Sequence, residues 1–140
     1  MSDETLRSID LTRTGTLRYE ATNARGGVLP VGSGDTEDFT PVELLLVAIA
    51  GCAAIDVDLI TGKRATAETF DLRAEGHKAR DEQGNHLVGL RVTLDLTFPE
   101  GEDGDRAREA LPRAIAQTRD RLCIVGRTVA LGEPIEYVEA

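Results

Sequence analysis

The segment from residue 40 to about residue 60 constrains the fold more than any other part of the sequence. Thr40 is a good N-cap, Pro41 suits the first helical position, and Glu43 completes a capping box three residues after the cap. These features predict a helix that ends near residues 61–62. Between residues 44 and 55 apolar side chains cover every face, so we expect the helix to be buried on all sides.

A helix that is apolar on every face needs more cover than one open sheet supplies. A sheet packs against one side of a helix, and the opposite side must lie against something else. In a chain of 140 residues, the simplest cover is a second copy of the same chain. The segment therefore predicts a homodimer with these helices in or near the interface.

The clearest strand pattern lies between residues 87 and 98. Apolar residues alternate strictly with polar or small ones, which predicts a long strand with one buried face. Residues 70–74 alternate in the same way, and residues 81–85 have the composition of a turn. We expect the two strands to pair as a hairpin. The apolar positions of the longer strand are Val88, Leu90, Val92, Leu94, Leu96 and Phe98.

The N-terminal part of the sequence has weaker patterns. Residues 7–19 alternate loosely around residues 13–16, which predicts a hairpin with a tight turn. The glycine-rich residues 26–34 and the acidic residues that follow predict a mobile loop.

The C-terminal part predicts a second helix and a last strand. Apolar residues recur at helical spacing from Asp105, and Pro112 is expected to kink or split that helix. Residues 135–138 predict a short strand. Because no repeat and no linker interrupts the chain, we predict one α+β domain over residues 1–140, with antiparallel sheets packed around the buried helix.

Composition excludes several classes of partner. Apolar residues make up 41% of the chain, so it can form a core, and the formal charge of −9 argues against binding to nucleic acid. The polar, acidic N-terminus does not resemble a signal peptide. The longest apolar run has 12 residues, fewer than the roughly 20 that a membrane span needs. We therefore expect a soluble, cytoplasmic protein with no membrane partner, whose cysteines are thiols.

The sequence contains no recognisable metal or cofactor motif. Cys52 and Cys123 are 71 residues apart, so they form no CxxC redox pair. Neither has the spacing of a zinc ligand with His77 or His86, which flank the predicted hairpin turn. We expect no metal and no cofactor.

Cys52 lies in the apolar run, about three turns after the predicted start of its helix. A free cysteine in such surroundings is usually a small inert hydrophobe, so a structural thiol is one interpretation. The helix dipole does not extend that far. A reactive thiolate at Cys52 would therefore require a cation from elsewhere in the chain, together with access for solvent.

Three segments of the sequence resemble the OsmC/Ohr family of osmotically induced and organic hydroperoxide resistance proteins. Residues 41–57 resemble the central cysteine helix, residues 121–128 the second cysteine segment, and residues 132–135 the family ending. The order of predicted elements agrees over nearly the whole chain. The resemblance implies an α+β fold that forms an intertwined homodimer with the cysteine helices at its centre.

The resemblance also implies roles for individual residues. Family peroxidases use the helix cysteine as a thiolate that attacks an organic hydroperoxide and becomes a sulfenic acid, and the second cysteine then forms a disulfide with it. A thiol or lipoyl group reduces that disulfide. Mapped onto this chain, Cys52 is the peroxidatic cysteine and Cys123 the resolving one. The arginine that holds the family thiolate corresponds best to Arg25, with Arg18 as the alternative.

Two positions depart from the family pattern. In the best-defined peroxidases a glutamate directly after the helix proline holds the arginine, whereas this chain has Val42 there and Glu43 one residue later. One helical step turns a side chain by about 100°. Glu43 is thus a candidate site residue that the capping box alone also explains. The shift matches an OsmC-like branch with Pro-x-Glu-Leu, and Gly126 replaces a serine common after the second cysteine.

Two functions follow from the resemblance. The first is a thiol-dependent peroxidase for organic hydroperoxides, in which the apolar helix lines a pocket for an alkyl tail. The alternative is a dimer that binds a small apolar or thiol-reactive ligand, or senses redox state, without efficient peroxidase turnover.

Overall fold

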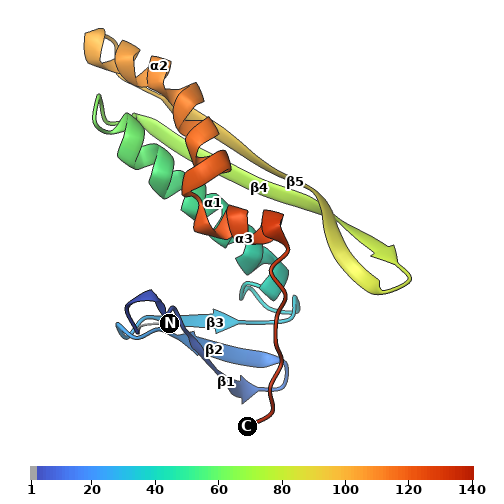
Figure 1. The fold of residues 1–140 in the computed structure, drawn as a ribbon. Coiled ribbons are helices and arrows are strands. Elements are labelled where there is room, and N and C mark those ends of the chain that lie inside the picture. Colours follow the sequence, from blue (N-terminus) through green and yellow to red (C-terminus); the bar gives the residue numbers. More distant parts are fainter. Residues whose placement is uncertain (1–2) are drawn as a thin grey trace. The chain divides into compact units, whose positions relative to one another are not determined.

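The computed structural model describes residues 3–140, which form helices and two antiparallel sheets (Figure 1). The predicted α+β class is therefore confirmed. The chain forms two compact units, Met1–Leu45 and Leu46–Ala140. The single domain expected over residues 1–140 stays a prediction.

The first unit contains a three-stranded antiparallel sheet in the order β1-β2-β3, preceded by the short 3-10 helix η1 (Asp3–Thr5). Strands β1 (Asp10–Gly15) and β2 (Arg18–Thr22) form the expected hairpin. Its turn lies at residues 16–17 instead of residues 13–16. Leu17 takes a positive φ of 55° in this turn, which few non-glycine residues do and which no local sequence pattern predicts.

Part of the glycine-rich segment is a strand, which corrects the prediction of a loop. Strand β3 (Val28–Val31) pairs with β2, with Val31 opposite Tyr19. It occupies an edge of the sheet, and there Pro30 is tolerated because an edge strand does not need every N–H for pairing. The strand has only four residues and is flanked by glycines, so its sequence does not show a recognisable strand pattern.

Helix α1 (Pro41–Thr61) begins and ends where the sequence predicts. The N–H of Thr40 donates to Glu43 Oε1 at 2.9 Å, and the N–H of Glu43 donates to Thr40 Oγ1 at 3.2 Å. This reciprocal pair is the predicted capping box, which satisfies two N–H groups that a helix start leaves unpaired.

The second unit contains a long hairpin of strands β4 (Thr69–Asp81) and β5 (Gly84–Thr97), as predicted (Figure 1). The register is regular from the open end up to Glu75 and shifts between Glu75 and His77. Gly76 occupies this irregularity, where an added Cβ would lie 2.9 Å from Leu90 Cδ2. A glycine at this position therefore lets β4 pass close to the Leu90 side chain.

Three helical segments follow the hairpin. Helix α2 (Glu102–Gln117) is continuous through Pro112, so Pro112 does not split it, and the kink that was the other expectation stays a prediction. The proline costs one i→i−4 hydrogen bond, but the buried alanine face of α2 keeps the helix packed. A π-helical turn, η2 (Thr118–Leu122), leads to Cys123 and helix α3 (Ile124–Leu131).

The predicted last strand at residues 135–138 is wrong. Helix α3 ends at Leu131, its C-cap Gly132 takes the left-handed conformation with φ 62°, and the chain beyond it has no regular structure. Ile135 and Val138 are 72% and 78% exposed. A segment of four residues gains stability as a strand only when a neighbouring strand pairs with it, and none does so in the part of the chain that the structure describes.

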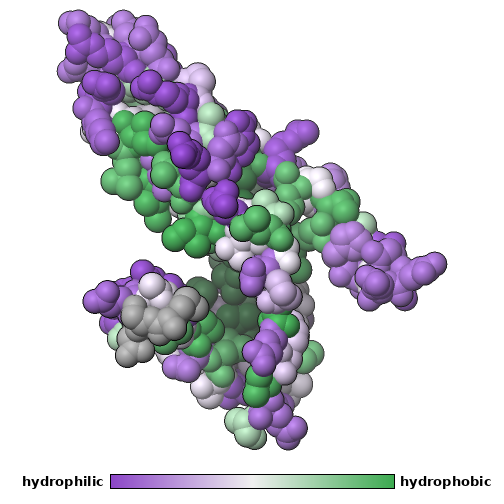
Figure 2. Space-filling model, viewed as in Figure 1, coloured by the Kyte–Doolittle hydropathy of each residue, from purple (hydrophilic) through white to green (hydrophobic). Residues whose placement is uncertain are grey.

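Helix α1 is buried on one face in the single chain. Its buried residues are Ala53, Val57 and Thr61. The opposite face remains exposed, and Figure 2 shows an apolar area where α1 runs. Burial on every side, which the sequence analysis expected only with a second copy of the chain as cover, therefore stays a prediction. Large apolar residues exposed on α1 are Val42, Leu45, Val47, Ile55 and Leu59.

Among residues 3–140, α1 is also the one helix long and apolar enough to cross a membrane by length and composition. A single helix of this kind is weak evidence for a membrane span, because the core helix of a soluble protein has the same properties.

Candidate functional site

Both cysteines belong to the second unit and lie in different elements. Cys52 is half-buried on α1, about three turns after the start of the helix. Cys123 is 5% exposed and lies between η2 and α3. Both are free thiols. The fold thus brings together two sulfurs that are 71 residues apart in the sequence.

The contact between the cysteines shows in the ionisation of Cys123. Burial raises the pKa of the Cys123 thiol above its ordinary value of 9.0, and a hydrogen bond with the Cys52 side chain raises it further. The N–H of Gly126 acts in the opposite direction, and the charges of Cys52 and Asp56 add to the rise. The net direction is upward, so Cys123 is held as a protonated thiol near neutral pH.

Cys123 also caps helix α3. Its Sγ accepts the N–H of Gly126 at 3.1 Å, and its own N–H donates to the Thr118 carbonyl at 3.1 Å. Gly126, where the family commonly has serine, therefore contributes through its backbone and needs no side chain for this contact. The two hydrogen bonds fix Cys123 between the end of η2 and the start of α3.

Asp56 and Thr118 lie near the two cysteines, although the sequence analysis identified neither as a site residue. Asp56 follows Cys52 by one turn on α1, and the Thr118 hydroxyl donates to Asp56 Oδ2 at 2.8 Å. The spacing of four residues from Cys52 could have pointed to Asp56. Thr118 reaches the site only through the packing of η2 on α1, which no local pattern reveals.

A cavity of about 370 Å³ lies beside Cys123 within the second unit. Its walls come from α1, β5, α2, η2 and α3, and most of them are apolar. The volume falls at the lower end of the range for small-molecule sites. The lining residues are Ile49, Ala53, Leu90, Val92, Leu94, Ile115, Thr118, Arg119, Cys123, Gly126 and Ala130.

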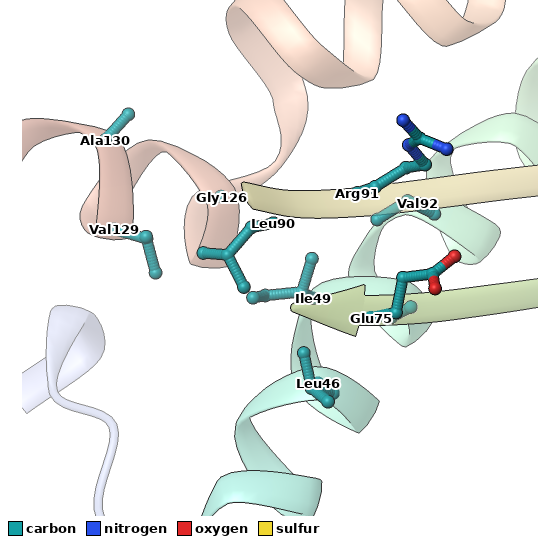
Figure 3. Close-up of a pocket in the computed structure, with 10 residues that line it drawn as sticks. Leu46, Ile49, Glu75, Leu90, Arg91, Val92, Gly126, Val129 and Ala130 are labelled. Atoms are coloured by element: carbon teal, nitrogen blue, oxygen red, sulfur yellow. The ribbon is translucent and has the colours of Figure 1, made fainter. Parts of the chain in front are cut away.

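A smaller apolar cavity of about 190 Å³ adjoins the first and shares five of its lining residues: Ile49, Leu90, Val92, Gly126 and Ala130. Figure 3 shows Leu46 and Ile49 of α1 facing Leu90 of β5 and Val129 of α3. The charged ends of Glu75 and Arg91, which pair across β4 and β5, point away from this apolar centre. Cys123 lines the larger cavity, whereas Cys52 lines neither of the two.

Arg119 is a cation at the larger cavity that the sequence reasoning did not consider. Its Nε donates to Asp120 Oδ1 at 2.7 Å, and its side chain is 68% exposed. The Asp120 carboxylate therefore already pairs with the Arg119 guanidinium.

Arg25 and Arg18, the two candidates for the thiolate partner, both lie in the first unit. Arg25 is exposed in a turn where Asn23 Oδ1 accepts its N–H at 3.1 Å, and Arg18 is exposed at the start of β2. Neither guanidinium makes an ion pair within residues 3–140. The pairing of either arginine with Cys52 stays a prediction.

Glu43 is engaged in the capping box with Thr40. Its carboxylate therefore has a structural task, and a role in holding an arginine stays a prediction. Val42, at the position of the family glutamate, is 51% exposed.

No group of three or more His, Cys, Asp or Glu residues suited to a metal ion occurs in the described part of the chain. His86 Nδ1 lies 3.7 Å from Asp81 Oδ2 at the hairpin turn, and His77 is exposed on β4.

Comparison with known proteins identifies the class. Residues 32–138 match the family model of the OsmC-like proteins, so the chain belongs to the OsmC-like family. An uncharacterised protein of Mycobacterium tuberculosis H37Rv is 31% identical over 125 residues, which cover 88% of each chain.

Solved structures show the same fold at low sequence identity. A hypothetical protein of Aquifex aeolicus VF5 superimposes with a TM-score of 0.73 at 19% identity, covering 90% of this chain and 88% of that one. An OsmC-like protein of unknown function from Vibrio cholerae has a TM-score of 0.71 at 11% identity, covering 89% and 93%. These comparisons confirm the family and the fold predicted from the cysteine segments.

Proposed function

We propose that this OsmC-like protein is a thiol-dependent peroxidase that reduces organic hydroperoxides, with Cys52 as the nucleophile and Cys123 as the resolving cysteine. The adjacency of two free thiols beside an apolar cavity is the observation that carries the proposal. Cys52 is the half-buried sulfur and Cys123 the buried one, so an oxidant from solvent meets Cys52 more readily.

The chemistry takes two steps at the two sulfurs. The Cys52 thiolate attacks the outer oxygen of the hydroperoxide, so that an S–O bond forms, the O–O bond breaks and the alkoxide leaves to become an alcohol. The Cys123 thiol then attacks the Cys52 sulfenic acid. An S–S bond forms, the S–O bond breaks, and the hydroxyl leaves as water with the Cys123 proton. An external dithiol or lipoyl group reduces the disulfide and restores both thiols.

The cavity supports an organic substrate over hydrogen peroxide. Its walls are mainly aliphatic, and an alkyl or aryl group placed there leaves water. Hydrogen peroxide has no apolar group, so contact with these walls would not strengthen its binding. We therefore assign the cavity to the apolar part of the hydroperoxide.

A second copy of the chain completes this proposal. The exposed apolar residues of α1 form a face that a globular protein rarely leaves in water. In a homodimer the α1 face of one protomer packs against its partner, which covers Leu45, Ile55 and Leu59. Cys52 lies seven residues from both Leu45 and Leu59 on α1, and therefore on the same side of the helix, so dimer formation also shapes access to its sulfur.

The test is stopped-flow oxidation of the fully reduced protein by cumene hydroperoxide and by hydrogen peroxide. The proposal predicts rapid consumption of one equivalent of cumene hydroperoxide and at least tenfold slower reaction with hydrogen peroxide, since only the former gains from apolar burial. Cys52→Ser should abolish the reaction. A wild-type rate no faster than that of Cys52→Ser would contradict the proposal.

A binding or redox-sensing dimer without efficient turnover is the second candidate. The observations that favour it are the valine at position 42, the engagement of Glu43 in the cap, and the placement of Cys123 instead of Cys52 on the cavity. This candidate predicts that an apolar ligand protects Cys123 from alkylation while hydroperoxide consumption stays at the background rate.

A further inference from the structure

The 370 Å³ cavity has one hydroxyl among its lining side chains in the described part of the chain, that of Thr118. Thr118 is 5% exposed, and its hydroxyl donates to Asp56 Oδ2 at 2.8 Å across the contact of η2 with α1. Placing a hydroxyl and a carboxylate beside an aliphatic wall is costly, and an apolar pair of the same shape would not carry that cost. The presence of this pair at the cavity is therefore a feature to explain.

The hydrogen bond lies where α1 and η2 meet at the cavity. Ile49, Ala53 and Asp56 are spaced by four and three residues, so they occupy one face of α1. Ile49 and Ala53 line the cavity, and Asp56 is the next residue on that face. Thr118 lines the cavity from η2. Cys52 stands one turn before Asp56, so the proposed nucleophile and this hydrogen bond belong to the same stretch of α1.

The direction of this hydrogen bond decides what Thr118 can offer to a ligand. A hydroxyl has one hydrogen to donate and two lone pairs that accept, whereas an ionised carboxylate only accepts. The Thr118 hydrogen is therefore committed to Asp56. No donor within residues 3–140 reaches the Thr118 oxygen, so its lone pairs remain free. A ligand in the cavity can use them only if it has a hydrogen-bond donor of its own.

We infer that Thr118, oriented by Asp56, is a substrate-binding residue that selects apolar molecules carrying an O–H group and accepts the O–H of an organic hydroperoxide. The inference rests on the proposed function for the identity of the substrate, and it names the group that the cavity recognises. In R–O–O–H the hydrogen is on the outer oxygen, which is the atom that the thiolate attacks. A hydrogen bond from this O–H to Thr118 Oγ1 holds the outer oxygen beside the stretch of α1 that carries Cys52.

The other polar side chains of the cavity do not make the same selection. Arg119 only donates, and its exposed guanidinium already pairs with Asp120. It would favour a ligand that accepts, such as a ketone. The Cys123 sulfur already accepts the N–H of Gly126, and sulfur is a weak acceptor. Recognition of an O–H group in the cavity therefore falls to Thr118.

The test compares three ligands of similar size that differ in one group. Cumyl alcohol has an O–H, acetophenone only accepts, and tert-butylbenzene does neither. Each ligand is titrated into the reduced, isotope-labelled full chain, and its dissociation constant is obtained from NMR shifts of backbone amides. Shifts at Gly126 and Ala130, which line the cavity, establish that the ligand binds there. The quantities compared are the ratios of the acetophenone and tert-butylbenzene constants to the alcohol constant, because a ratio cancels general effects of a variant on the cavity.

The double variant Thr118→Val with Asp56→Leu replaces the polar pair by an apolar pair of similar shape. Both ratios should fall by about threefold to tenfold from their wild-type values, which corresponds to the loss of one hydrogen bond to the alcohol. Thr118→Ser keeps the hydroxyl and should keep both ratios close to wild type. Ratios in the double variant equal to those of the wild type would overturn the inference.

The single variant Asp56→Leu tests the orientation of the hydroxyl. It releases the Thr118 hydrogen, which can then be donated to a ketone, while the oxygen still accepts from the alcohol. The acetophenone ratio should therefore fall, and the tert-butylbenzene ratio should stay near the wild-type value. A tert-butylbenzene ratio that falls as far as in the double variant would show that Asp56, and not Thr118, accepts the O–H, and would overturn the inference.

Arg119→Gln is the matched control at the same cavity. Both ratios should remain at their wild-type values, because Asp120 already occupies the guanidinium. A change of the ratios in Arg119→Gln without a change in the double variant would assign the selection to Arg119 instead. Thermal unfolding of each variant establishes that the compared proteins are folded.

These titrations contain no hydroperoxide, so their outcome is independent of peroxidase activity. The expected ratios in a protein that does not consume hydroperoxide would remove the proposed function and keep the selection of O–H groups by Thr118. Unchanged ratios in an active peroxidase would remove the inference alone. Cumene hydroperoxide itself, titrated into Cys52→Ser so that it is not consumed, should bind about as tightly as cumyl alcohol, and binding no tighter than that of tert-butylbenzene would contradict the inference.

Discussion

Among single residues, Cys52 is the one on which the proposed function depends most. Its helix supplies apolar neighbours and no cation. A thiolate there must gain its stabilisation from a guanidinium, and Arg25 is our candidate.

Arg25→Ala should slow the alkylation of Cys52 at neutral pH and the consumption of cumene hydroperoxide together, each by about tenfold or more, because a cation beside a thiolate increases its population by at least that factor. Arg18→Ala is the matched control and should leave both rates close to wild type. Loss of both rates in Arg119→Ala, with Arg25→Ala unaffected, would assign the thiolate partner to the cavity arginine instead.

Cys123→Ser should separate the two chemical steps. Its Cys52 is expected to react with hydroperoxide at the wild-type rate and then to stop as a sulfenic acid, because no second thiol is present to displace the hydroxyl. A dimedone-type probe followed by mass spectrometry should label Cys52 in this variant and not in the wild type. Equal labelling of both proteins would show that Cys123 does not resolve the sulfenic acid.

The raised pKa of Cys123 also predicts how stability depends on pH. A thiol whose folded pKa lies above its unfolded value contributes stability that is fully present below about pH 9.0 and is lost as pH rises through the folded pKa. The free energy of unfolding of the reduced protein should therefore fall more steeply above pH 9.0 than that of Cys123→Ser. Urea titrations at several pH values measure the difference, and parallel curves for the two proteins would refute it.

At the scale of elements, local patterns predicted well the elements whose own residues carry the information. Thr40 and Glu43 mark the start of α1 and form the expected cap. The predicted alternation of β5 holds from Val92 to Leu96. Val88 and Leu90, which were expected on the same buried face, are 43% and 40% exposed, because the register with β4 shifts there. The π-turn η2 and helix α3 were not predicted. The sulfur of Cys123 caps α3, and cysteine is not among the usual capping residues.

In the candidate site, too, some residues could be predicted from the local sequence and others could not. Both cysteines were found from the sequence, because they resemble the segments of a known family. Asp56 and Thr118 were not, since their pairing depends on how η2 packs on α1. The missing last strand has a related cause: apolar alternation over four residues does not say whether a partner strand is available.

The exposed face of α1 leads to a prediction about this element. Ala48 is exposed in the single chain, yet in the proposed dimer it lies within the interface. Ala48→Asp should therefore place an unpaired carboxylate between two helices and shift the protein to monomer or prevent folding. Gln83→Asp, in the hairpin turn, adds the same charge far from that face and should leave the protein dimeric. A dimeric Ala48→Asp protein by light scattering would show that this face is not the interface.

In the molecule as a whole, family, fold and candidate chemistry agree. The chain is a member of the OsmC-like family with that family's fold. A pair of neighbouring thiols and an apolar cavity lie within its second unit. In the homodimer that we propose, a second copy would cover the remaining apolar face, and two such sites would lie in one particle.

The proposed function requires the two cysteines to act together, with hydroperoxide as oxidant. The most direct test is to mix fully reduced wild-type protein with one equivalent of cumene hydroperoxide, trap remaining thiols and analyse the product by mass spectrometry. The account predicts loss of both thiols, release of one equivalent of alcohol and a disulfide between Cys52 and Cys123 of the same chain. Both thiols still free after the hydroperoxide has been given ample time to react would contradict it.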